Sequence, residues 1–68
     1  MSMRIRLNGK EREIGEGHTV RTLLRELELE PGMIVVEHNR DILDRDSYAD
    51  VPVREGDTIE LVHFVGGG

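Results

Sequence analysis

The chain has 68 residues and carries 14 acidic against nine basic side chains, which gives a formal net charge of −5. A domain of this size buries only about 60% of the surface that its unfolded chain exposes, so it has little room for a deep catalytic cleft, and we do not expect a self-contained enzyme. Phosphate backbones and anionic lipids repel an acidic domain, so we expect neither a nucleic acid nor a membrane as partner.

Cysteine usage and the N-terminal residues indicate the cellular setting. The chain has no cysteine, so it offers no thiol of its own as a disulfide partner, a nucleophile or a soft metal ligand. The longest apolar run, Met33 to Val36, is far too short to cross a bilayer. Because the first residues lead into a strand pattern without a signal-peptide core, we expect a cytoplasmic location.

The first two predicted elements are strands joined by a tight turn. Apolar and polar residues alternate over residues 3–7, which is typical of a half-buried strand. Asn8-Gly9 follows, the dipeptide that best accepts positive φ at both central positions of a hairpin turn. A second strand over residues 10–14 completes the predicted hairpin.

A helix is predicted next. Thr19 is a typical N-cap residue, since its hydroxyl can accept from an unpaired backbone N–H. One apolar stripe at helical spacing follows it, formed by Val20, Leu23, Leu24 and Leu27. Pro31-Gly32 ends the segment, because proline disfavours helical geometry in the residue before it. The predicted helix is therefore about three turns long.

The second half of the chain predicts strands separated by turns. Residues 33–37 predict a third strand, and their apolar run, Met33 to Val36, favours an interior position in the sheet. Residues 42–43 predict a short fourth strand or a buried loop. Residues 44–52 predict an irregular stretch that Tyr48 and Val51 anchor to the core. After a turn, the last predicted strand runs over residues 58–65.

The order of these elements predicts a two-layer α+β domain. One helix laid across a mixed sheet of four to five strands buries the helical stripe and one sheet face. With the first and last strands side by side in the centre, this is the ubiquitin-like β-grasp arrangement. We expect residues 1–65 to form this domain and residues 66–68 to form a flexible glycine tail.

Side chains suited to catalysis or metal binding are few. The histidines, His18, His38 and His63, lie 20 and 25 positions apart, so no pair has helical metal-ligand spacing. Ser47 lacks the flanking glycines of a nucleophile elbow. We therefore predict no catalytic residue, no metal site and no bound cofactor.

The C-terminal glycines indicate a different kind of chemistry. Gly66, Gly67 and Gly68 directly follow a strand rich in valine and phenylalanine. Glycine has the greatest conformational freedom and no side chain, and three extended residues reach about 10 Å. Such a tail can thread a narrow channel and bring the α-carboxylate of Gly68 into another protein's active site. A frayed end or a cloning remnant is the alternative that the tail alone leaves open.

The whole pattern resembles the ThiS family, the small ubiquitin-like sulfur carriers of bacterial thiamine biosynthesis. The matching features are the hairpin with Asn8, the helix entry Gly17-His18-Thr19-Val20, the turn Glu55-Gly56-Asp57 and the ending over residues 59–68. The ending is the specific part, since the remaining features fit any β-grasp protein. Pro52 departs from the pattern, because proline removes a ladder donor and confines its strand to an edge or a short stretch.

The resemblance implies a carrier that is the substrate of other enzymes. A ThiF-type adenylyltransferase would use ATP to convert the Gly68 carboxylate into an acyl-adenylate. A cysteine desulfurase or another persulfide donor would then replace AMP with sulfur and leave a thiocarboxylate. Thiazole synthase would accept that sulfur. The free carrier is expected to be a monomer.

Three other functions remain open. The small subunit of molybdopterin synthase shares the fold, the tail and the adenylation, although its family usually has a proline-containing segment before the glycines, where this chain has Val65. A ubiquitin-like modifier would end on a lysine of another protein as an isopeptide. A β-grasp binding module of the kind that touches RNA would make no use of the tail, and the net charge of −5 argues against it.

A partner-docking face is predicted beside the tail. Val62 and Phe64 lie on the face of the last strand opposite Ile59 and Leu61. If Ile59 and Leu61 pack on the helix, Val62 and Phe64 stay partly exposed. Exposed apolar side chains next to a functional tail favour docking, and coverage by a loop is the alternative.

Overall fold

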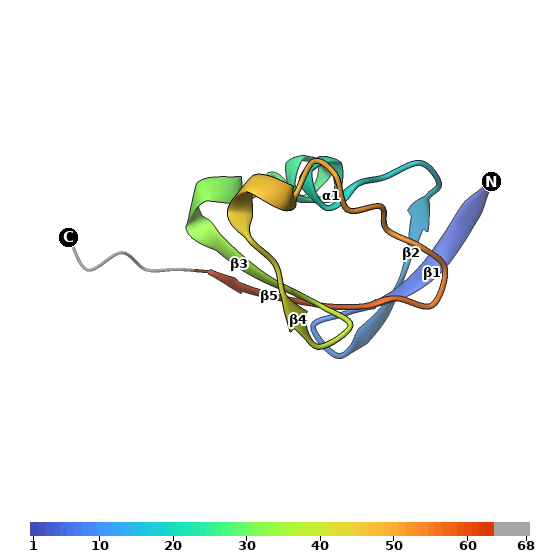
Figure 1. Ribbon diagram of the computed structural model, residues 1–68. Helices are drawn as coiled ribbons and strands as arrows, with labels where there is room; N and C mark the ends of the chain where they lie inside the picture. The colour runs from blue at the N-terminus through green and yellow to red at the C-terminus, as the bar shows by residue number, and fades with distance from the viewer. Residues whose placement is uncertain (64–68) are drawn as a thin grey trace.

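The computed structural model describes residues 1–63 as a five-stranded sheet in the order β2-β1-β5-β3-β4, with α1 across one face (Figure 1). The strands are β1 Ser2–Leu7, β2 Lys10–Gly15, β3 Ile34–His38, β4 Asp41–Ile42 and β5 Thr58–His63, and the helices are α1 Val20–Glu26 and two 3₁₀ turns, η1 Pro31–Met33 and η2 Arg45–Ser47. β1 and β5 pair in parallel, and the other neighbours pair antiparallel. This is the β-grasp arrangement predicted from the sequence.

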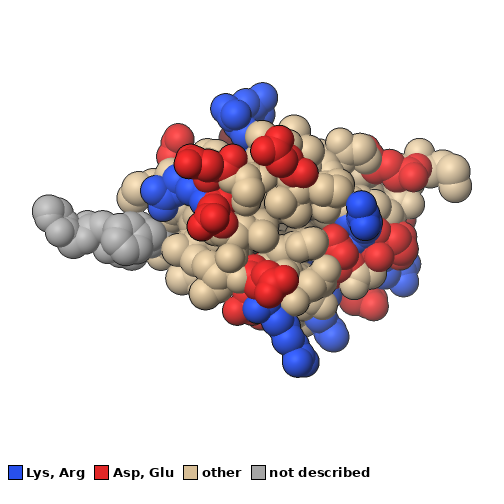
Figure 2. Space-filling model, viewed as in Figure 1, with Lys and Arg blue, Asp and Glu red and all other residues tan. Residues whose placement is uncertain are grey.

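The β1–β2 hairpin forms as predicted. Asn8 and Gly9 have φ values of 51° and 81°, the left-handed geometry that a tight hairpin turn needs. On the solvent side of the hairpin, Arg4 lies opposite Glu13 and Arg6 opposite Glu11. Each arginine therefore faces a carboxylate across the strands. Figure 2 likewise shows acidic and basic side chains interspersed over one face of the molecule.

The core lies between the helices and one face of the sheet. Its buried apolar side chains are Ile5, Ile14, Val20, Leu23, Leu24, Ile34, Val36, Tyr48, Val53 and Ile59. The predicted anchoring by Tyr48 is confirmed: its ring is buried and its hydroxyl donates to the Ile34 carbonyl oxygen at 2.8 Å. Because that bond ties the irregular stretch after β4 to β3, the long loop has a fixed path.

The start of one predicted strand was wrong, and the predicted short fourth strand was confirmed. β3 is an interior strand, but it begins at Ile34 because Met33 belongs to η1. Of the two alternatives for residues 42–43, the structure shows the short strand, β4, in which Ile42 is 73% exposed opposite Glu37 on the side away from α1. Leu43, the next residue, is half-buried and packs against the core.

The helix is shorter than predicted. Thr19 caps it as expected, with its hydroxyl accepting from the Thr22 N–H at 3.2 Å, but α1 ends at Glu26. Glu28 adopts a left-handed φ of 61°. Its N–H donates to the Arg25 carbonyl and the next N–H donates to the Leu24 carbonyl, each at 2.9 Å. These two bonds form a Schellman motif, which ends the helix before the proline is reached.

Glu28→Gly is expected to stabilise the fold by about 1 kcal/mol. Glycine adopts positive φ without the steric cost that a β-carbon imposes there. Glu28→Ala is the matched control, because it removes the carboxylate near the helix C-terminus but keeps the β-carbon. Urea denaturation should place the midpoint of the glycine variant above those of the alanine variant and the wild type. Coincident midpoints for all three proteins would show that the turn stores no strain.

Candidate functional site

β5, the strand that leads to the glycines, is paired on both sides. β1 pairs with its first residues in parallel, and β3 pairs with it antiparallel over residues 59–63. Ile59 is completely buried beneath α1, and Leu61 is half-buried against the same core. The strand runs toward the end of the molecule that lies opposite the N-terminus (Figure 1). Central pairing and a buried face make β5 a rigid base for whatever follows it.

The two hairpin turns extend this support with side chains. Asn8 Oδ1 accepts from the Leu61 N–H at 2.7 Å, beyond the point where β1 ends. Asn39 Oδ1 accepts from the Thr58 N–H at 2.9 Å, beyond the end of β3. Each asparagine thus replaces a missing strand partner of β5. From the sequence, Asn8 was predicted only as a turn residue and Asn39 was missed, although an Asn in a predicted turn is a known signal for such bonds.

Asp57 fixes the turn that enters β5. Its carboxylate accepts from the Arg54 N–H at 2.8 Å, from His38 Nε2–H at 2.8 Å and from Asn39 Nδ2–H at 3.2 Å. Burial by itself raises the pKa of Asp57, but the hydrogen bonds from Arg54, His38 and Asn39 outweigh burial and lower that pKa below its ordinary value. The fully satisfied carboxylate has a structural role, since it ties the β3–β4 hairpin to the start of β5.

The predicted docking residue Val62 is exposed. It is 60% accessible and lies opposite Val35 on the face of the sheet that faces away from α1. Two positions earlier on the same face, Glu60 lies opposite Glu37. We call these four side chains the outer face. The outer face combines apolar surface with two carboxylates that face each other. Like charges directly opposite each other repel, so this arrangement lowers the stability of the free domain.

The other predicted site residues lie outside the described residues. They are Phe64, the second docking residue, and the tail glycines Gly66, Gly67 and Gly68. The predicted boundary between a domain over residues 1–65 and a tail over residues 66–68 lies there as well. Their roles stay predictions, and the site described so far is the base that leads to them.

His18, His38 and Ser47, which were set aside as catalytic or metal-binding candidates, have structural partners. His18 Nε2–H donates to Glu26 at 2.9 Å, and Ser47 Oγ–H donates to the Asp44 carbonyl at 2.7 Å. Within residues 1–63, no three or more histidine or acidic side chains are grouped as metal ligands would be. No helix in that part of the chain has the length and apolar character that a membrane crossing requires.

The sequence left several protein families open, and a match to one family model distinguishes between them. The ThiS family model matches residues 5–68, from the second half of β1 through β5 to the glycines. The chain belongs to the ThiS family. Sulfur carrier protein ThiS of Bacillus subtilis is 38% identical over 68 residues, and the match covers 94% of this chain and 98% of that protein.

Solved structures agree with the ThiS assignment. The crystal structure of thiamine biosynthesis protein ThiS from Geobacter metallireducens superposes with a TM-score of 0.83 at 30% identity, covering 97% of this chain and all of that one. The solution structure of a thiamine biosynthesis protein from the same organism superposes with a TM-score of 0.79. The β-grasp fold expected from the sequence is therefore that of the ThiS family.

Two longer proteins also contain a ThiS-like segment. Thiazole synthases of Paramagnetospirillum magneticum and Magnetococcus marinus are 42% and 41% identical to this chain over 66 residues. Each match covers 97% of this chain, and the chain spans only 20% of the length of either synthase. A segment similar to this chain therefore forms part of two proteins that are named thiazole synthase.

Proposed function

We propose that this chain is a sulfur carrier of thiamine biosynthesis and that the α-carboxylate of Gly68 carries the sulfur. The observation that supports the proposal most strongly is the ThiS family match, which extends through the glycines to residue 68. The relative from Bacillus subtilis, named a sulfur carrier protein, matches over 98% of its own length. The absence of cysteine is consistent with this chemistry, because no thiol of the carrier competes for the sulfur.

The proposed reaction begins with activation, because a carboxylate is a poor electrophile. An oxygen of the Gly68 carboxylate attacks the α-phosphorus of ATP on a ThiF-type adenylyltransferase, and pyrophosphate leaves. The terminal sulfur of a persulfide, supplied by a cysteine desulfurase or another donor, attacks the acyl carbon and AMP leaves. A thiol then cleaves the sulfur–sulfur bond, which frees the thiocarboxylate and oxidises the two donor thiols to a disulfide. The carrier contributes no acid, base or cofactor to these steps.

The proposed acceptor of the sulfur is a thiazole synthase. Support comes from the two synthases that contain a segment similar to this chain over about a fifth of their length. Because a segment similar to this chain is part of these synthases, we expect a separate chain of this kind to act together with a thiazole synthase. No observation on this chain favours a molybdopterin synthase or a protein-conjugation role.

The outer face is the proposed docking surface for the adenylyltransferase, together with Phe64. Val62 and Val35 supply apolar contact area next to the end of β5, and the facing Glu37 and Glu60 call for cationic groups on the partner. A partner arginine or lysine at that point would relieve the repulsion between the two carboxylates. The free chain is proposed to be monomeric.

Val62→Ala is expected to raise the Kd for the adenylyltransferase about five- to thirtyfold, the loss typical of an apolar anchor at an interface centre. Phe64→Ala should have a similar effect. Lys10→Ala is the control, since Lys10 is exposed at the start of β2, on the opposite edge of the sheet from β3 and β4. Titration calorimetry measures all three. Equal affinities for Val62→Ala and wild type would remove Val62 from the docking surface.

A growth assay tests the proposed function. The chain is expressed in a bacterium that lacks its own thiamine sulfur carrier, and in a second strain that lacks the small subunit of molybdopterin synthase. We expect growth without thiamine in the first strain and no molybdenum-enzyme activity in the second. Rescue of only the second strain would assign the chain to the other pathway, and rescue of neither would contradict a carrier role in both.

A further inference from the structure

A hollow on the helix side of the molecule is not used by any step proposed above. It encloses about 550 Å³ between α1, η1 and η2. Arg21 and Arg25 border it from α1, and Arg45 borders it from η2. We call it the arginine hollow. Its lining holds three of the nine basic side chains and two of the 14 acidic ones, Glu30 and Asp46, so three positive and two negative charges leave a net charge of +1 in a chain whose net charge is −5.

The three arginines have no salt-bridge partner within residues 1–63. None has a carboxylate oxygen within 4.0 Å, even though Glu30 and Asp46 border the same hollow. Arg21 and Arg25 are also four positions apart on one helix, where like charges destabilise by about 0.2–0.5 kcal/mol. Neither helix stability nor salt bridges within residues 1–63 therefore explain why these three arginines lie together.

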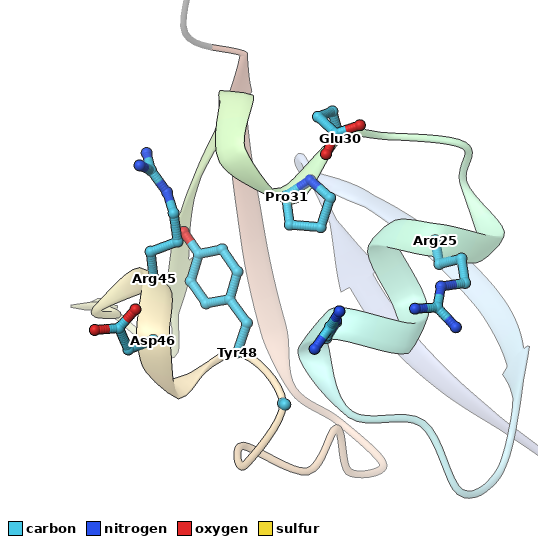
Figure 3. A pocket seen from close by; sticks show the side chains of 8 residues that line it. Arg25, Glu30, Pro31, Arg45, Asp46 and Tyr48 are labelled. Carbon is cyan, nitrogen blue, oxygen red and sulfur yellow. The ribbon is translucent and has the colours of Figure 1, made fainter.

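The floor of the hollow is apolar and fixed. The Tyr48 ring is 3% exposed, and its hydroxyl is already bonded to the Ile34 carbonyl oxygen. Figure 3 shows the ring beside Pro31, with Arg25 on one side of Tyr48 and Arg45 on the other. Arginine and tyrosine are the residues most enriched among the energetic centres of protein interfaces. The hollow therefore combines an apolar seat with cations on opposite rims.

We propose that the arginine hollow binds an acidic segment of a partner protein, with carboxylates on both sides of an apolar side chain. The apolar side chain would rest on Pro31 and Ala49, above the buried Tyr48 ring. The carboxylates would pair with the arginines, whose planar donors suit carboxylate oxygens. A small molecule fits less well, because small-molecule sites bury most of their ligand among convergent polar groups, whereas all three arginines are exposed. The hollow and the outer face lie on opposite sides of the sheet, so both can be occupied at once.

The test is a nuclear magnetic resonance titration of the isotope-labelled full chain. The probe is a synthetic peptide with two glutamates on each side of a leucine. We expect saturable shift changes at the amides of residues 21–25 and 45–49, and an at least tenfold loss of affinity in the Arg21→Glu/Arg45→Glu double variant. Lys10→Glu/Arg40→Glu is the matched control, with the same charge change at exposed positions beside the two hairpin turns, and it should keep the wild-type affinity.

Two further probes identify what is bound. Inorganic phosphate and a peptide with lysines in place of the glutamates should produce no saturable changes at these amides. Saturation by phosphate would make the hollow a small-anion site and overturn the proposal. Equal losses of peptide affinity in the two double variants would show that only net charge matters and would overturn the proposal. Absence of binding by the acidic peptide would overturn it as well. Unaltered amide shifts elsewhere in each variant verify that it is folded.

Discussion

Asp57→Ala is expected to destabilise the fold by about 2–4 kcal/mol. The substitution removes a carboxylate that accepts three hydrogen bonds and leaves the donors on His38, Asn39 and Arg54 without it. A chain of 68 residues has a total stability of roughly 3–10 kcal/mol, so the loss is a large part of the whole. Denaturant unfolding monitored by circular dichroism measures it.

Asp57→Asn is the isosteric comparison. It keeps the side-chain shape and one acceptor oxygen but removes the negative charge, so we expect about half the loss seen with alanine. If both variants unfold at the wild-type midpoint, the carboxylate does not hold the turn before β5. If only the alanine variant is destabilised, shape matters and charge does not.

The lowered pKa of Asp57 also predicts a pH dependence. The folded state holds the carboxylate ionised to a lower pH than the unfolded state does, so this stabilisation is complete above the unfolded pKa and is lost as the pH falls through the folded pKa. We therefore expect the wild type to lose stability below about pH 4, the ordinary range for an aspartate. The Asp57→Asn variant should show a shallower decline over the same range.

Deleting Gly68 is expected to lower the rate of acyl-adenylate formation at least a hundredfold while leaving the fold unchanged. The shortened tail ends on the carboxylate of Gly67, about 3.5 Å short of its normal reach. A displacement of about 1 Å at a reacting centre can already cost a hundredfold in rate. Pyrophosphate release by the adenylyltransferase measures the effect.

Deletion of Met1 is the matched control for the tail. It also removes one terminal residue, but Met1 is fully exposed at the opposite end of the molecule from the end of β5 (Figure 1). We expect a wild-type rate. A Gly68 deletion that is adenylated as fast as the Met1 deletion would mean that the enzyme does not read the length of the tail.

The sequence predicted elements whose signals are local. Asn8-Gly9 defines its own turn, Thr19 caps its own helix, and the apolar stripe of α1 is readable from spacing alone. Val62 was also placed correctly on the exposed face, because alternation along a strand is a property of the strand itself.

The features that were missed depend on residues far apart in the sequence. Asp57 contacts His38 and Asn39 only after β3 and β5 have paired. The local sequence around each of these three residues does not predict the contact. The end of α1 was misplaced because Glu28 occupies a left-handed position where glycine is usual. The arginine hollow likewise forms only when η2 brings Arg45 near α1.

The most direct test of the carrier role is an intact-mass measurement. The chain is incubated with a ThiF-type adenylyltransferase, ATP, a cysteine desulfurase with cysteine, and a thiol reductant. We predict a transient adenylate and then a product in which one oxygen has been replaced by sulfur, with fragmentation placing the sulfur on Gly68. An unchanged mass, under conditions in which the same enzymes load a known carrier, would contradict a sulfur-carrying role for the glycine tail.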